Sequence, residues 1–168
     1  MGFLLFLVLS TNKRRMTPKE NLAKHGHQLP KASTPGGSYS SVNIRGNIAY
    51  IAIQFPILND EYLYKGRLGE DLGTAEGYKA MELCALNVLA QIDKKVGFEN
   101  LVGLNHFDAY FQSAADWDEG PKVVNGASDL FVKILEDKGT HSRAIFGVHK
   151  LPRNFSVGLT ASFTIKPN

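Results

Sequence analysis

The chain has 168 residues, of which 43% are hydrophobic and 21% charged, as is usual for a soluble globular protein. A chain of this length is expected to form one domain with a sizeable core. The formal net charge of +3 reflects 19 Lys and Arg against 16 Asp and Glu, and Lys13, Arg14 and Arg15 account for the excess. The body is therefore neutral and lacks a basic stripe, which argues against a nucleic-acid-binding protein.

The first 15 residues differ in character from the rest of the chain. Phe3–Leu9 is an uninterrupted apolar run, and the positive charges follow it. The run is too short to span a bilayer, and a secretory signal has its positive charges in front. We expect residues 1–15 to be an extension or a gene-prediction error, with Met16 as the true start and residues 16–168 as the single domain. The alternative is a weak targeting or anchor segment.

Residues 17–24 favour a short helix, and the stretch 25–37, rich in Gly, Pro and Ser, predicts a linker. His25 and His27 lie in this linker without other nearby metal ligands. We therefore expect a surface loop there and no metal site.

A β-hairpin is predicted next. Two strand-like runs, Tyr39–Arg45 and Ile48–Phe55, flank Gly46-Asn47, which suits a two-residue turn. The run Ile48–Ile53 is continuously apolar, as in a strand that is covered on both faces. Pro56 is expected to end the strand.

The strongest helix prediction is Ala75–Ile92, where apolar residues recur at three- and four-residue steps. Thr74 is expected to cap its first turn, and Gly97 to end it. Cys84, the only cysteine, lies within this run. It allows no internal disulfide, which fits a reducing compartment, and we expect a buried small hydrophobe rather than a reactive thiol.

The second half of the chain predicts further alternating elements. Leu101–Phe111 is a strand with His106 as an interior histidine, and an amphipathic helix runs from Pro121 to a stop at Gly139. Two strands, Ser142–His149 and Ser156–Ile165, close the chain.

The element order β-β-α-β-α-β-β predicts an α+β fold, a mixed β-sheet with two helices packed on one face. The Ile48–Ile53 run indicates that the other face is also largely apolar. This chain offers no cover for that face, so we expect the protein to form oligomers.

Arg143 opens one of the last strands among mostly apolar neighbours. A buried arginine is costly without an anionic partner, and its planar fork matches a carboxylate. We interpret Arg143 as the residue that binds a ligand carboxylate. The alternatives are a structural ion pair and a charge at a strand end that faces solvent.

Several short motifs follow one another at characteristic spacing. They are Pro35-Gly-Gly-Ser-Tyr39, Ile53-Gln-Phe-Pro56, Gly69-Glu-Asp-Leu72, the helix of residues 75–92, Val124-Asn-Gly-Ala-Ser-Asp-Leu130, His141-Ser-Arg143 and Leu151-Pro152. Together they resemble the Rid (reactive intermediate deaminase) or YjgF family, in its branch labelled endoribonuclease L-PSP, chorismate-mutase-like. The resemblance extends from about Asn21 to Ile165. It implies a homotrimer with the sheets inward, the helices outside and ligand clefts between neighbouring subunits.

The resemblance also implies a site. Arg143 would hold the substrate carboxylate as the catalytic and binding arginine, with Tyr39 and Asn125 in the same cleft and Gly126 and Ser128 along its wall. The implied reaction hydrolyses an enamine or imine acid, such as 2-aminoacrylate or 2-iminobutanoate, to a 2-oxo acid and ammonia. It needs neither a metal nor an organic cofactor, because the imine carbon is already electrophilic.

Two positions depart from the family pattern. Deaminating members carry a glutamate where this chain has Gly158, and a glycine where it has Ile53. No acidic residue follows Asp137. His141 shares a strand face with Arg143 and could replace the missing carboxylate as a proton donor. The alternative is a histidine at the surface or one that only supports other site residues, and Ser142 is not aligned with it as a nucleophile.

Two hypotheses follow. The protein is a weak 2-iminobutanoate/2-iminopropanoate deaminase (a hydrolase), or a non-catalytic protein that binds a small carboxylic acid on the same trimeric fold. The neutral body argues against an endoribonuclease. We expect no nucleic acid or membrane partner for the folded body and a cytoplasmic location. A mitochondrial or membrane-associated location is the alternative if residues 1–15 are a targeting segment.

Overall fold

The computed structural model describes residues 14–167. The expectation for the extension therefore falls almost wholly on residues outside the described part, and it stays a prediction. At its border, Arg15 forms an exposed ion pair with Asp137, with nitrogen and oxygen 2.6 Å apart.

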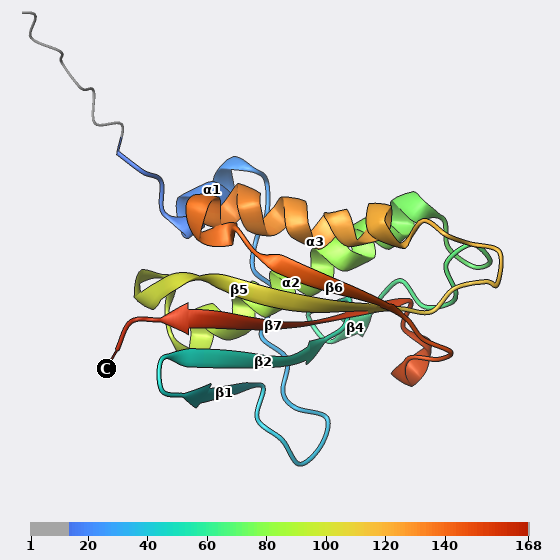
Figure 1. Cartoon of the computed structure of the whole chain (residues 1–168), viewed down its shortest axis with the longest axis horizontal. Helices are drawn as coiled ribbons and strands as arrows, with labels where there is room; N and C mark the ends of the chain where they lie inside the picture. Colours follow the sequence, from blue (N-terminus) through green and yellow to red (C-terminus); the bar gives the residue numbers. More distant parts are fainter. Residues whose placement is uncertain (1–13, 168) are drawn as a thin grey trace, which may run out of the picture.

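Five strands form one mixed sheet (Figure 1). Its spatial order is β1-β2-β7-β5-β6, so the last strand of the chain lies at the centre. Neighbouring strands are antiparallel except for β5 and β6, which run parallel. The strand bounds are Val42–Arg45 (β1), Ile48–Gln54 (β2), Leu101–Phe111 (β5), Ser142–Gly147 (β6) and Val157–Ile165 (β7).

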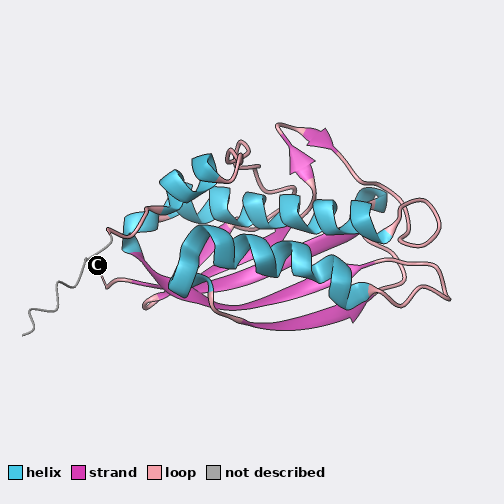
Figure 2. Ribbon diagram, turned by 90° about the horizontal axis from the view of Figure 1, so that it is seen from above, coloured by secondary structure: helices cyan, strands magenta, loops and turns pink. Residues whose placement is uncertain are grey.

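The three helices found within residues 14–167 lie on the same face of the sheet (Figure 2): α1 (Pro18–Lys24), α2 (Thr74–Lys95) and α3 (Gly120–Leu135). α2 and α3 pack against each other, and α1 packs against α3. This arrangement confirms the predicted α+β class, and α1 corresponds to the short helix expected over residues 17–24. None of the helices within residues 14–167 is long and apolar enough to cross a membrane.

The core lies between the helices and the sheet. Large side chains from both layers are fully buried there, among them Phe107, Phe131, Phe163 and Met81. Cys84 is also fully buried, and burial raises the pKa of its thiol well above the usual value, which keeps it protonated and unreactive.

A second, two-stranded sheet was not predicted. β3 (Ile57–Leu58) and β4 (Glu61–Tyr62) pair across Asn59 and Asp60, whose φ angles are 49° and 74°. Two residues with positive φ form the turn that matches the twist of a hairpin. Three short 3₁₀ turns, η1 (Phe98–Asn100), η2 (Glu136–Gly139) and η3 (Pro152–Asn154), complete the chain.

The uncovered face of the sheet is more polar than predicted. Ala49 and Ile51 of the apolar run are buried under the helices, whereas Tyr50 is half exposed. In the register of the sheet, Tyr50 lies opposite Ser162, and His106 lies on the other side of Ser162. The face is therefore a mixture of hydroxyl, histidine and aromatic groups. The expectation of a largely apolar face was wrong, because alternate residues of a strand point to opposite faces.

The start of α2 also differs from the prediction. Thr74 is the first helical residue and Gly73 occupies the capping position. The Thr74 hydroxyl instead donates to Glu119 and accepts a bond of 3.2 Å from the Trp117 indole. These bonds join the start of α2 to the loop that precedes α3.

Candidate functional site

Arg143 lies in the edge strand β6, and its side chain reaches the neighbouring helix α3. It is paired in register with Phe107, which is buried on the helix-covered face. Its Nη1 donates to Asn125 Oδ1 at 2.8 Å and to Ser128 Oγ at 2.9 Å. The structure therefore brings together three of the predicted site residues.

The two α3 partners are three positions apart, so they share one face of the helix. Gly126 faces elsewhere, because it is buried where α3 crosses α2. A Cβ at Gly126 would lie 2.2 Å from the carbonyl oxygen of Tyr78, far inside contact distance. Gly126 thus permits close packing of the two helices, and it does not line the wall beside Arg143.

His141 contacts Ser128, one of the two hydrogen-bond partners of Arg143. Its ring packs on Phe107, with ring centroids 4.8 Å apart. Nδ1 lies 2.6 Å from the carbonyl oxygen of Gly139, and Nε2 lies 3.0 Å from Ser128 Oγ. A carbonyl oxygen only accepts, so Nδ1 carries a proton, and Nε2 shares a hydrogen bond with the Ser128 hydroxyl. The same Ser128 oxygen accepts from Arg143, so His141 acts as a positioning residue.

Arg143 has no carboxylate partner within residues 14–167. The described ion pairs involve other residues, and its hydrogen-bond acceptors are a neutral amide and a hydroxyl. A half-buried guanidinium without a counter-ion attracts an anion, and its Nη2 and Nε form no side-chain bond in the described part of the chain. The group formed by Arg143, Asn125, Ser128 and His141 is called the arginine site below.

Tyr39 lies far from the arginine site, at the other edge of the sheet. It precedes β1, whereas Arg143 belongs to β6. Tyr39 lines a pocket of about 430 Å³, called the Tyr39 pocket below. Other residues that line it are Ile53, Phe55, Tyr62, Arg153 and Phe155.

The two departures from the family pattern, at residues 53 and 158, are in contact. A Cβ at Gly158 would lie 2.9 Å from Ile53 Cδ1 and 3.0 Å from Phe55 Cε1. The isoleucine side chain therefore occupies the space that a side chain at position 158 would enter. The two changes compensate each other sterically, and they leave an apolar surface where a carboxylate would be expected.

His106 is half exposed, which corrects the prediction of an interior histidine. Its Nδ1 lies 2.7 Å from Ser142 Oγ, and its Nε2 lies 3.0 Å from Asp108 Oδ1. Serine, histidine and aspartate form such chains where a hydroxyl acts as a nucleophile. Here the three side chains lie along the uncovered sheet face beside Thr160 and Ser162, and they contribute to the polar character of that face.

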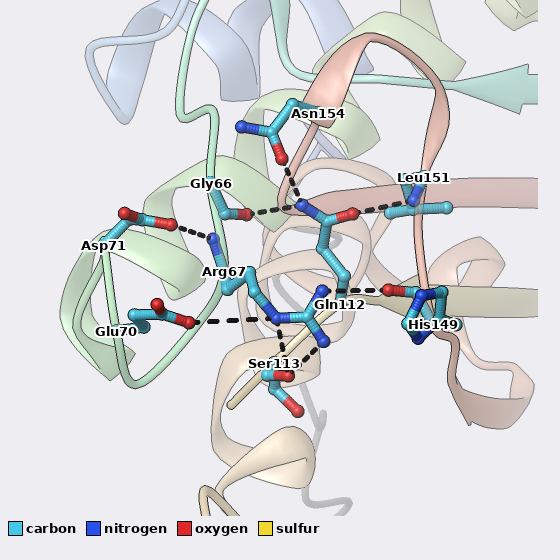
Figure 3. A network of polar contacts seen from close by, with 9 residues as sticks. All are labelled: Gly66, Arg67, Glu70, Asp71, Gln112, Ser113, His149, Leu151 and Asn154. Carbon is cyan, nitrogen blue, oxygen red and sulfur yellow. Dashed lines mark hydrogen bonds and ion pairs between the residues drawn. The ribbon is translucent and has the colours of Figure 1, made fainter. Parts of the chain in front are cut away.

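A buried polar network at the end of β5 escaped the sequence analysis (Figure 3). Gln112 is 1% exposed and lies between Gly66, Leu151 and Asn154, all of which it contacts by hydrogen bonds. Arg67 lies beside it and donates to the carbonyl oxygens of Ser113 and His149. The only signal in the sequence is a glutamine directly after an apolar strand. Within residues 14–167 no cluster of His, Cys, Asp and Glu is arranged to hold a metal ion.

The fold and the arginine site define an α+β protein whose sheet carries helices on one face and, at one edge, an arginine without a carboxylate partner in the described part of the chain. Residues 19–164 match the family described as "YjgF/chorismate mutase-like, putative endoribonuclease", and the chain belongs to this family. It is 31% identical to Protein TCP17 of Trypanosoma cruzi over 143 aligned residues. The aligned region covers 84% of this chain and 89% of TCP17.

Two crystal structures are similar over most of the chain. A Shewanella oneidensis protein that carries the same endoribonuclease description is 30% identical, with a TM-score of 0.87 over 89% of this chain and 100% of its own. Atu1372 of Agrobacterium tumefaciens, described as of unknown function, is 30% identical, with a TM-score of 0.83 over 89% of this chain and 92% of its own.

Proposed function

We propose that the protein binds a small 2-oxo, enamine or imine acid through Arg143. The observation that carries this proposal is the half-buried guanidinium of Arg143, which neutral acceptors hold in place without any carboxylate partner in residues 14–167. Asn125 and Ser128 fix Nη1, so the remaining donors keep a defined direction. This arrangement suits a bidentate bond to a ligand carboxylate.

The cleft would be completed by a neighbouring subunit of a homotrimer. Arg143 and Tyr39 lie at opposite edges of the sheet, so one subunit cannot bring them together around a small acid. The family resemblance implies a trimer with clefts between subunits, in which one subunit's Arg143 faces another's Tyr39. The uncovered sheet face gives such a trimer a surface to bury.

Hydrolytic deamination is the second candidate function. Water would add to the imine carbon and ammonia would leave, so the products are a 2-oxo acid and ammonia. Arg143 would orient the substrate through its carboxylate. The apolar contact between Ile53 and Gly158 leaves no carboxylate there to activate the water, which favours binding over turnover.

Arg143→Ala should weaken the binding of 2-oxobutanoate by about 10- to 150-fold, the equivalent of losing charge-assisted hydrogen bonds. Arg143→Lys should restore only part of the affinity, because an ammonium cannot reproduce the planar fork. Isothermal titration calorimetry on the full chain measures both effects. Arg45→Ala is a matched control, since Arg45 is an exposed β1 arginine whose side-chain bonds within residues 14–167 go only to Asn43 and the Ile44 carbonyl.

Thermal melting separates binding from a purely structural role. A ligand-binding Arg143 leaves the melting temperature of the alanine variant near that of the wild type, while affinity falls. If the melting temperature falls and affinity declines only in step with it, Arg143 is a structural residue. Unchanged affinity in the alanine variant would remove the arginine site from the proposal.

The homotrimer predicts a molar mass three times that of the 18.5 kDa chain. Multi-angle light scattering of the full chain and of residues 16–168 measures this mass directly. A monomer mass for both would contradict the trimer and, with it, the cleft between subunits.

A further inference from the structure

A groove of about 410 Å³ lies where the described chain begins, between residues 15–19, η1 and the end of α3. Figure 1 shows α1 beside the end of α3 at this corner of the molecule, and the two helices are in contact. The groove shares no residue with the Tyr39 pocket or with the arginine site. The proposed function therefore leaves it without an occupant.

The inner lining of the groove is apolar. Phe98, Ile134 and Leu135 line it, and each of them also belongs to the hydrophobic core. Pro18 is half-buried at the start of α1, and Met16 is 37% exposed although its side chain is large and apolar. Apolar surface that is exposed to water favours burial against another apolar group.

The charges around the groove cancel. Three basic and three acidic residues line it: Arg15, Lys19, Lys138, Glu99, Glu136 and Asp137. Two of them, Arg15 and Asp137, form an ion pair with nitrogen and oxygen 2.6 Å apart. A charged ligand gains little net attraction from such a rim. The groove therefore suits an uncharged, apolar occupant.

The two sides of the groove are fixed to each other. The buried Asn21 side chain donates from Nδ2 to the Ile134 carbonyl oxygen at 3.0 Å, which joins α1 to the end of α3. The ion pair between Arg15 and Asp137 joins the same two segments. Thr17 begins α1 with a capping box, so the direction in which the chain enters the helix is also set. The groove is thus preformed.

The sequence contains an apolar segment next to the groove. The preceding part of the chain includes Phe3–Leu9, seven apolar residues in succession. Five residues, 10–14, connect this run to Arg15 on the rim. Five residues extend over at most about 18 Å, so the run stays within reach of the groove. A segment that is tethered so closely has an effective concentration of about millimolar, and even a weak contact is then occupied.

We infer that the run Phe3–Leu9 docks in the groove and covers Met16, so that side chains of the run pack against Phe98 and Leu135. The groove lies where the run is attached, its lining is apolar and its rim carries no net charge. The contact is made within one chain and leaves the molar mass unchanged. Residues 1–15 are then an extension that stabilises the domain. The inference is independent of the proposed function.

Thermal melting of full-chain variants tests the stabilisation. Phe6→Asp/Leu7→Asp should lower the melting temperature by about 5 °C or more, because charged side chains do not enter an apolar lining. Ser10→Asp/Thr11→Asp is the matched control, since it adds the same charges between the run and the rim, and it should melt as the wild type does. Met16→Asp should lower the melting temperature of the wild type more than that of the Phe6→Asp/Leu7→Asp variant, because the contact is already lost there.

Disulfide formation tests the position of the run directly. Phe6→Cys and Glu99→Cys in one full chain should form a bond on mild oxidation, because Glu99 lines the groove. Phe6→Cys with Lys79→Cys is the control, since Lys79 lies beside the start of α3, at the opposite end of that helix. The native Cys84 is fully buried and does not compete. Non-reducing electrophoresis and peptide mapping show which cysteines are joined and whether they belong to one chain.

The inference is overturned if Phe6→Asp/Leu7→Asp melts at the wild-type temperature, or if the two cysteine pairs oxidise equally fast. Disulfides between chains would place the run of a second copy in the groove and would also reject it. Sedimentation with vesicles that contain phosphatidylserine tests a lipid surface as the partner of the run. Binding by the wild type but not by Phe6→Asp/Leu7→Asp, without a disulfide at residue 99, would assign the run to that surface and reject the docking.

Discussion

Gly126→Val should lower the free energy of unfolding by at least about 3 kcal/mol, at the upper end of overpacking effects. A Cβ at this position would lie 2.2 Å from the Tyr78 carbonyl oxygen and 3.2 Å from the Glu82 nitrogen. Both atoms belong to the α2 backbone and cannot turn aside as a side chain would, so the helices must separate. Urea denaturation followed by circular dichroism measures the change.

A smaller substitution at the same position distinguishes the close helix contact from ordinary helix propensity. Replacing a helical glycine with alanine normally stabilises a helix by about 1 kcal/mol, yet Gly126→Ala should also destabilise the protein. Val132→Ala is the control, because Val132 lies in the same helix and is half exposed. We expect that variant to stay within about 0.5 kcal/mol of the wild type. Wild-type stability of Gly126→Ala would show that α2 and α3 do not approach this closely.

The second large effect concerns Ile53 and Gly158. Gly158→Glu alone should destabilise the protein by about 1–3 kcal/mol, because its Cβ meets Ile53 Cδ1 at 2.9 Å. Ile53→Gly alone should also destabilise it, since it removes an apolar contact. The double variant should recover part of the loss, with a coupling energy of about 0.5–3 kcal/mol in a double-mutant cycle.

The same double variant tests the second candidate function. It places a carboxylate where deaminating relatives are expected to have one and removes the side chain that fills the space. We expect the double variant to release ammonia and 2-oxobutanoate from freshly generated 2-iminobutanoate faster than the wild type does. If the losses of stability in the two single variants simply add in the double variant, the two residues are not coupled. Equal release by the wild type would show that catalysis needs no carboxylate at position 158.

Most regular elements could be predicted from hydrophobic periodicity. The strand Leu101–Phe111 was predicted with the bounds that the structure shows, and the helix expected at Ala75–Ile92 extends over Thr74–Lys95. The β3–β4 hairpin was missed because its turn is Asn59-Asp60, without the glycine that usually marks such turns. The position of β7 between β2 and β5 was not predictable either, because pairing between distant strands leaves no local pattern in the sequence.

The arginine site was predicted only in part. The motif around Asn125 located the helix that faces Arg143, but a motif does not give the rotation of a helix about its axis. Successive residues of a helix are about 100° apart, so Asn125 and Ser128 face β6 while Gly126 faces α2. The positive φ of Arg153 and its contact with the Tyr62 ring were not predictable either, because they join segments that are distant in the sequence.

The central position of β7 has a consequence for synthesis of the chain. β7 pairs with β2 on one side and β5 on the other, and it ends at Ile165. On the ribosome, the β1–β2 hairpin and the β5–α3–β6 unit exist before the strand that joins them. Until β7 emerges, the edges of β2 and β5 are open to pairing with other chains. The sheet therefore closes only once β7 has been made, and chains interrupted before β7 are exposed to aggregation.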